Sequence, residues 1–196
     1  MIIKMEDIRV ESLYKSFGSK PVLKDFSATF TAGQVSIIMG ESGCGKTTLL
    51  NIVLGIEKPD GGRILGVPAR VSAVFQEDRL CEDFSAGTNV RITAAKGITQ
   101  KDISDALTAL GLGDNIKTPV RELSGGMKRR VAIARAMLAE SALVVLDEPF
   151  TGLDSANRAA AAAFILSRLN GRTLIAVTHS TADADLLGAC QIIRMT

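Results

Sequence analysis

A glycine-rich loop between a β-branched strand and a helix restricts this chain more than any other feature. The strand is expected at 34–39 and the helix at 47–54, closed by a left-handed cap at Gly55. Between them the letters GESGCGKT fit G-x-x-x-x-G-K-[ST] at every required position. Glycines let backbone N–H groups turn inward around phosphates, and a helix start adds positive potential. The pattern predicts a phosphate-binding loop made by Gly40, Glu41, Ser42, Gly43, Cys44, Gly45, Lys46, Thr47 and Thr48.

An acidic pair supplies what such a loop needs for a metal-bound phosphate. In this motif Lys46 reaches the β- and γ-phosphates and the Thr47 hydroxyl ligates Mg²⁺. Asp147 follows the apolar run 143–146, at the strand end where ligands of open α/β sheets bind. Glu148 is a candidate base that orients and polarises an attacking water. A chance glycine turn or a solvated acidic pair would not explain the strand–loop–helix context.

Strands alternate with helices along the chain, which indicates an α/β fold with a mostly parallel sheet. At about 150 residues per domain, 196 residues indicate one domain over 1–196, and no internal repeat or linker divides it. Strands are expected in the first thirty residues and near 63–65, 71–75, 143–146 and 173–178; helical patterns cover 87–111, 124–139 and 155–169.

Composition excludes several classes of protein. The longest uncharged stretch, 26–40, is shorter than the ~20 apolar residues of a membrane-spanning helix, and the N-terminal residues do not resemble a signal peptide. The chain is therefore expected to be cytoplasmic. A net charge of +2 argues against a polyanion-coating surface, and three widely spaced cysteines argue against a disulfide framework. A single histidine removes most zinc sites.

The segment LSGGMKRR at 123–130 separates the phosphate-loop families. A GTPase would carry an Asn-Lys-x-Asp guanine reader, and the nearest sequence, TQKD at 99–102, has the wrong order. Ser124 followed by Gly125 and Gly126 exposes backbone N–H groups at a helix start, a second anion site. Helix capping alone would also explain these three residues, so both interpretations stay open. The KRR run that follows is expected on a solvated helix face rather than against nucleic acid.

Taken together, the motifs resemble those of ATP-binding-cassette (ABC) ATPases. Besides the phosphate loop and the signature LSGG, Gln76 matches the family's Q-loop, Asp154 its D-loop and His179 its switch histidine. Tyr14 lies where the family places the aromatic that stacks on adenine. The resemblance covers most of the chain and implies a P-loop NTPase core with a mostly parallel sheet. It also implies an N-terminal antiparallel β subdomain and a helical subdomain inserted at about 81–139.

The resemblance also implies the ligands and their residues. ATP and Mg²⁺ are expected, with Thr47, Gln76 and Asp147 at the metal. Glu148, His179 and Gln76 are expected to be catalytic, His179 as a sensor of the γ-phosphate. Each has a simpler alternative, such as an ordinary strand aromatic for Tyr14 or a strand-end cap for His179.

Two positions depart from the family pattern. Met127 stands where the family usually has glutamine, and Gly152 where it usually has a small non-glycine residue. The first change loses a polar contact but leaves the backbone donors. Both changes are expected to lower activity or loosen a closed state, and neither removes a catalytic group.

In the family, two cassettes face each other head to tail. ATP on the Lys46 loop of one chain is closed over by Ser124 and Gly126 of the other. One chain here carries one loop and one signature, so a homodimer is implied, and a heterodimer with a paralogue stays open.

Among the functions open to such a cassette, the energy subunit of a membrane transporter is favoured. The letters VFQEDRL at 74–80 resemble importers of the nitrate, sulfonate and taurine type. Separate permease subunits would contact the stretch between Gln76 and Ser124 at the cytoplasmic face of the cell membrane. An importer would also need an extracytoplasmic solute-binding protein. The alternative is a cassette that acts on nucleic acid or ribosomes. The segment between the two motifs is too short for the coiled coil of chromosome ATPases, and translation factors carry two cassettes per chain.

Overall fold

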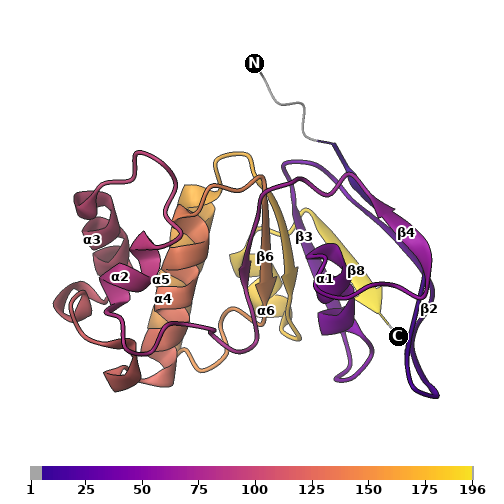
Figure 1. The fold of residues 1–196 in the computed structure, drawn as a ribbon, viewed down its shortest axis with the longest axis horizontal. Helices are drawn as coiled ribbons and strands as arrows, with labels where there is room; N and C mark the ends of the chain where they lie inside the picture. The colour runs from indigo at the N-terminus through magenta and orange to yellow at the C-terminus, as the bar shows by residue number, and fades with distance from the viewer. Residues whose placement is uncertain (1–5, 196) are drawn as a thin grey trace.

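The computed structural model describes residues 6–195 as two sheets and six α-helices (Figure 1). The strand expectation for the first thirty residues is comparable only from residue 6, because residues 1–5, like residue 196, lie outside the described residues. The strands are β1 (Ile8–Phe17), β2 (Lys20–Phe30), β3 (Val35–Gly40), β4 (Gly61–Leu65), β5 (Val71–Val74), β6 (Leu143–Asp147), β7 (Thr173–Val177) and β8 (Gln191–Met195). The helices are α1 (Lys46–Val53), α2 (Ala86–Arg91), α3 (Gln100–Ala109), α4 (Gly125–Leu138), α5 (Ser155–Leu169) and α6 (Thr181–Leu186).

A five-stranded parallel sheet, in the order β5-β6-β7-β3-β8, forms the centre of the molecule. Every residue of β6 and β7 is buried, as their apolar runs predict for strands covered on both faces. The carboxyl ends of parallel strands meet at one edge of a sheet. The loops that follow β3, β5, β6 and β7 therefore gather at the same edge, and this places the candidate site.

Each face of the parallel sheet carries its own apolar core. On one face α1 lies between this sheet and the antiparallel sheet β2-β1-β4, as Figure 1 shows, with Leu49 and Leu50 fully buried. On the other face α4 and α5 pack against the sheet, and α2 and α3 lie further out. Each fully buried leucine or isoleucine contributes roughly 1.5–3 kcal/mol. The two cores therefore hold the parallel sheet, and with it the carboxyl edge that carries the loops, from both faces.

The helical pattern expected over 87–111 is broken in the structure. Two helices, α2 and α3, are separated by the segment 92–99. Gly97 has a φ of +95°, which a helix does not allow. Thr99 then starts α3 with a reciprocal capping box, since its backbone N–H donates to Asp102 and its hydroxyl accepts from the Asp102 N–H. The helical pattern over 87–111 therefore corresponds to two helices, which Gly97 and this internal cap separate.

Two elements carry too weak a pattern to be expected. Helix α6 has six residues, fewer than helical periodicity needs to be visible, and β8 has alternating exposure at the edge of the sheet. The other strands and helices lie within a few residues of their expected bounds, and Ser124 caps α4 as expected. The fold class is confirmed. Within residues 6–195, none of the helices combines the length and the apolar character needed to cross a bilayer.

Candidate active site

A cavity of about 380 Å³ opens at the carboxyl edge of the parallel sheet. It lies between the phosphate loop and the tip of the β1–β2 hairpin, and it brings together residues that are far apart in the sequence. Its lining consists of Phe17, Lys20, Val22, Ser42, Gly43, Gly45, Lys46, Thr47, Thr48, Gln76, Asp147, Glu148 and Val177. The loop after β3, the segment after β5 and the acidic pair at the end of β6 therefore meet as expected.

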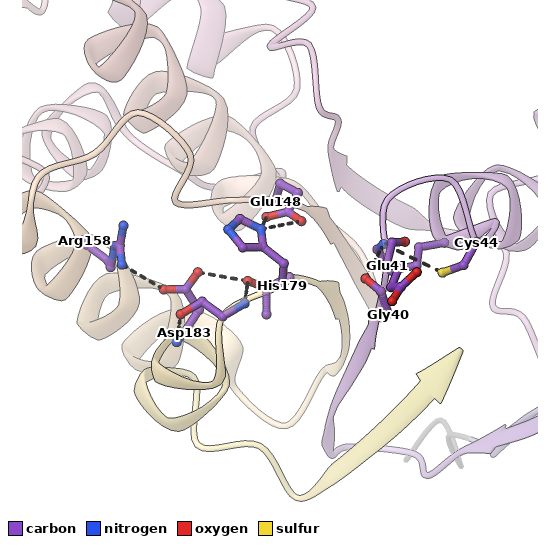
Figure 2. A network of polar contacts seen from close by, with 10 residues as sticks. Gly40, Glu41, Cys44, Glu148, Arg158, His179 and Asp183 are labelled. Atoms are coloured by element: carbon purple, nitrogen blue, oxygen red, sulfur yellow. Dashed lines mark hydrogen bonds and ion pairs between the residues drawn. The ribbon is translucent and has the colours of Figure 1, made fainter. Parts of the chain in front are cut away.

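The phosphate loop is shaped by glycine where α1 begins. Gly45 is the N-cap of α1 and has a φ of +100°, a conformation that other residues reach only with strain. A Cβ at this position would also come within 3.0 Å of the Val22 and Leu23 side chains. The Lys46 ammonium donates hydrogen bonds to the carbonyls of Gly40 (2.8 Å) and Glu41 (2.7 Å), two residues that Figure 2 labels. The Lys46 ammonium is thus held against the backbone at the start of the loop.

Thr47 and Asp147 place two oxygen atoms side by side in the lining of the cavity. The Thr47 hydroxyl donates to Asp147 Oδ2 at 2.9 Å, and Asp147 is only 5% exposed. Burial raises the pKa of the Asp147 carboxyl because it disfavours the charged form, and the bond from Thr47 offsets part of this effect. A desolvated carboxylate beside a hydroxyl fits a hard cation such as Mg²⁺, which prefers oxygen ligands.

Glu148 stands at a strained backbone position next to this pair. Its φ is +49°, in the left-handed region, which costs a non-glycine residue of order 1–3 kcal/mol. Its backbone N–H donates to the Val177 carbonyl at 3.0 Å and ties the end of β6 to the end of β7. Strain that the surrounding structure holds in place is typical of functional positions.

His179 faces the Glu148 carboxylate, as Figure 2 shows. Its Nδ1 lies 3.1 Å and 3.0 Å from the two carboxylate oxygens. The imidazole itself is largely exposed and is not part of the cavity lining, so it reaches the cavity through Glu148. Glu148 and His179, which the sequence marks separately as candidate catalytic residues, therefore lie side by side.

The residues on both sides of His179 are held by Asp183. The Thr178 hydroxyl donates to Asp183 Oδ2 at 2.9 Å, and the Asp183 N–H donates to the Ser180 hydroxyl at 3.4 Å. Arg158 of α5 lies 3.4 Å from Asp183 Oδ1 (Figure 2). The loop that carries His179 is thus fixed to α5 and α6 by a buried carboxylate.

The signature residues lie outside this cavity. Ser124 accepts a hydrogen bond from the Met127 N–H as the N-cap of α4, so the capping interpretation holds within one chain. A Cβ on Gly126 would come within 3.0 Å of the Gly152 carbonyl, so glycine is needed for this close approach. Gly126 therefore lies beside the segment that leads to Asp154, and neither Gly125 nor Gly126 lines the cavity of Lys46.

Asp154 has a local role of the same kind. It caps α5, accepting from the Asn157 N–H at 2.8 Å, and its hydrogen bonds to Asn157 lower the pKa of its carboxyl. Gly40, Glu41 and Cys44 face a second cavity, of about 560 Å³, on the other side of the phosphate loop. Their expected contribution to phosphate binding rests on the backbone of the loop.

The aromatic residue beside the cavity is not the expected one. Tyr14 packs near Gly61 on the neighbouring strand β4 and does not line the cavity, whereas Phe17 does. Phe17 ends β1 at the hairpin tip, directly before Gly18. An aromatic residue next to a hairpin turn that faces the phosphate loop was the signal available in the sequence.

The KRR run does not form the solvated face that its charge predicts. Arg129 and Arg130 are buried, and their guanidinium groups donate to backbone carbonyls of neighbouring segments. That expectation was wrong because forked guanidinium groups satisfy carbonyls that no sheet or helix pairs.

The phosphate loop, the acidic pair after β6 and the glutamine after β5 around one cavity define the class of phosphate-loop nucleoside triphosphatases. Residues 23–151 match the profile of the family described as ABC transporter, and the chain belongs to this family.

Curated relatives and a solved structure agree with this assignment. The aliphatic sulfonates import ATP-binding protein SsuB 2 of Pseudomonas fluorescens is 37% identical over 186 residues, which are 90% of this chain and 69% of the relative. The taurine import ATP-binding protein TauB of Roseobacter denitrificans is 38% identical over 185 residues, 87% of this chain and 69% of the relative. The dimeric structure of MJ0796, a bacterial ABC transporter cassette, superposes with a TM-score of 0.82 at 25% identity, covering 96% of this chain and 94% of that one. The expected family and the expected ATP-hydrolysing activity are confirmed.

Proposed function

We propose that this chain is the ATP-hydrolysing subunit of a membrane importer whose solute passes through separate permease subunits. The observation that carries the proposal is the single cavity in which Lys46, Thr47, Gln76, Asp147 and Glu148 converge. Its support from relatives is the similarity to sulfonate and taurine import ATP-binding proteins over most of the chain. A soluble cassette acting on nucleic acid or ribosomes has no comparable support.

Lys46, Thr47 and Asp147 bind the phosphate end of ATP in this proposal. The Lys46 ammonium, held by two loop carbonyls, exchanges them for β- and γ-phosphate oxygens. The Thr47 hydroxyl and the Asp147 carboxylate hold Mg²⁺, with Gln76 as the third protein residue. The metal, when bound, neutralises charge that develops on the phosphate oxygens.

Glu148, Gln76 and His179 carry out hydrolysis. Gln76 orients a water molecule, Glu148 accepts its proton, and the water oxygen attacks the γ-phosphorus. The bond from that phosphorus to the β-bridging oxygen breaks, so ADP leaves and inorganic phosphate forms. His179 Nδ1, 3.0 Å from Glu148, holds the carboxylate and senses the γ-phosphate.

Closure of the site needs a second chain. Ser124, Gly125 and Gly126 lie outside the cavity that Lys46 lines, and they are available to cover the nucleotide of a partner. Asp154, which follows the residues packed against Gly126, lies at the same interface. The dimeric form of the MJ0796 cassette supports this arrangement.

The permease is proposed to dock on the segment between Gln76 and Gly111, at the cytoplasmic face of the membrane. Two large apolar side chains there, Phe84 and Ile92, are exposed. An extracytoplasmic protein would deliver the solute.

Purification of the tagged chain from native membranes in mild detergent tests the transport role. An integral membrane protein is expected to accompany the wild type and to be lost in Ile92→Asp. It should be retained in the control Leu166→Asp, which changes an exposed residue of α5. A soluble homodimer with ribosomes, DNA or nothing attached would leave the ATPase intact and contradict the importer.

Phe17 is proposed in place of Tyr14 as the aromatic that stacks on adenine. Phe17→Ala is expected to weaken ATP binding about 5- to 150-fold, because stacking of a base on an aromatic ring is worth about 1–3 kcal/mol. Tyr14→Ala should leave the affinity unchanged. Both side chains are about half exposed, at 51% and 46%, so neither change should unfold the protein. Titration with a fluorescent ATP analogue measures both variants, and a larger loss in Tyr14→Ala would reverse the proposal.

A further inference from the structure

The side chain of Arg129 joins α4 to the segment that carries Gln76. Its Nη1 donates to the Phe75 carbonyl at 2.6 Å and its Nη2 to the Gln76 carbonyl at 2.5 Å. Nη1 also lies 3.2 Å from Asp78 Oδ1, and the side chain is only 6% exposed. One buried guanidinium thus holds two consecutive carbonyls and one carboxylate.

This arrangement fixes Gln76 more firmly than its own strand does. The ladder between β5 and β6 ends at Val74, so the carbonyls of Phe75 and Gln76 lie beyond it. A buried charged group is costly unless it is hydrogen-bonded, and the planar fork of arginine satisfies two acceptors in one fixed geometry. A displacement of α4 is therefore expected to displace the backbone of Gln76 as well.

Helix α4 begins at the signature. Ser124 is its N-cap, and Arg129 lies about one turn further along the same 14-residue helix. A change in the position of Ser124 and Gly126 therefore reaches Arg129 through one continuous helix.

We propose that Arg129 is a positioning residue that couples the signature end of α4 to Gln76 in the same chain. Closure of the signature over the nucleotide of a partner chain then sets Gln76 in this chain's own cavity. The inference rests on the proposed function, because it requires the two-chain ATPase described above.

Arg135 provides a matched control on the same helix. Its guanidinium donates to the carbonyls of Arg79 (2.8 Å) and Asp78 (3.0 Å), the next part of the same segment, and neither of these hydrogen bonds goes to Gln76. If α4 merely anchors the segment, substitution of Arg129 and of Arg135 should have equal effects on kcat. If Arg129 positions Gln76, substitution of Arg129 should have the larger effect.

The kinetic test compares Arg129→Lys with Arg135→Lys. Lysine keeps the charge, but one ammonium does not reproduce the planar fork. Arg129→Lys is expected to lower kcat about 10- to 100-fold, the range seen when a supporting hydrogen bond is removed from a site. Its KM for ATP should be unchanged, and Arg135→Lys should remain close to wild type. Equal losses in the two variants would overturn the inference.

A double-mutant cycle separates positioning from general damage. In a Gln76→Ala background, Arg129→Lys is expected to cause little further loss of kcat, because it acts through the side chain already removed. Additive losses would contradict the inference. Asp78→Asn removes the carboxylate but leaves both carbonyl bonds, and it should keep the wild-type kcat. Asp78→Asn also serves as a second test if Arg129→Lys proves unstable. A loss of kcat in Asp78→Asn as large as that in Gln76→Ala would assign the effect to the Arg129–Asp78 ion pair and contradict the role of the carbonyl bonds.

Hydrogen–deuterium exchange supplies a readout that does not depend on turnover. In a Glu148→Gln background, ATP is expected to slow exchange over 75–78 in the parent and in Arg135→Lys, and not in Arg129→Lys. Slowing in all three would overturn the coupling. Failure of the parent to form an ATP-dependent dimer would instead contradict the proposed function, and the inference would fall with it.

Discussion

Glu148→Gln is expected to bind ATP with the affinity of the wild type and to lose about 10²–10⁴-fold in kcat. The loss follows from removal of the proposed general base, since such a group typically contributes a factor in this range. Binding should persist because the proposed contacts to the phosphates come from Lys46 and Thr47, and glutamine keeps the shape of the side chain. Its amide still lies within reach of His179, 3.0 Å from the present carboxylate.

The same variant should accumulate as a dimer. Because the two chains close over ATP and separate after hydrolysis in the proposed cycle, a chain that binds without hydrolysing remains closed. Light scattering with and without ATP measures the dimer, and single-turnover release of phosphate measures hydrolysis. Glu77→Gln, an exposed acid one residue from Gln76, is the control and should behave as wild type. Rapid hydrolysis by Glu148→Gln would remove Glu148 from its assigned role.

The phosphate site could be predicted because its information is local. Residues 40–48 are contiguous, and strand, loop and helix follow one another in the sequence with their own signals. Asp147 and Glu148 were placed by the same logic, since a fully apolar run marks a central strand and its end marks the ligand edge. The left-handed backbone of Glu148 could not be predicted, because only the neighbouring strands impose it.

Phe17, rather than Tyr14, lines the cavity, and strand periodicity alone does not reveal this because β1 is irregular. A regular strand alternates its faces with a period of two, so each side chain can be assigned by counting. The pairing of β1 with β2 shifts register three times, after Val10, Leu13 and Lys15, and Ser12 has a φ of +47°. Each irregularity re-aims the side chains that follow. Counting along the strand therefore fails between Tyr14 and Phe17.

Arg129 illustrates a different limit. A run of three basic residues at a helix start is typical of a solvated face, and nothing local indicates that carbonyls from a segment some fifty residues earlier will meet it. The free carbonyls after β5 exist because the ladder stops at Val74. Carbonyl groups left without a strand partner in this way can be identified only from the assembled sheet, and not from the local sequence.

Asp147→Asn is expected to change stability and function in opposite directions. Burial raises the pKa of the Asp147 carboxyl, so the fold disfavours its ionised form. Asparagine keeps the shape, and its Oδ1 can still accept the Thr47 hydroxyl that now lies 2.9 Å away. The variant without nucleotide should therefore melt higher, by about 2–4 °C for each kcal/mol gained.

The pH dependence of this gain has a definite sign. A pKa raised in the native state means that the folded chain binds the proton more tightly than the unfolded chain. The contribution of Asp147 to stability therefore falls as the pH rises from the pKa of this carboxyl in the unfolded chain through its pKa in the folded chain. The advantage of Asp147→Asn should grow over that interval and then stay constant. Asp154→Asn is the control, because hydrogen bonds from Asn157 lower the pKa of Asp154 and its ionised form stabilises the fold. It should not raise the melting temperature.

Ligand-dependent melting completes the test. ATP with Mg²⁺ at 100 times Kd should stabilise the wild type by about 2.7 kcal/mol. Asp147→Asn should lose the part of this increment that depends on Mg²⁺, because the carboxylate oxygen proposed to hold the metal is gone. ATP with a chelator should stabilise both proteins alike. A variant that melts lower without nucleotide would contradict the cost of the buried charge, and one that keeps the Mg²⁺ increment would remove Asp147 from the metal site.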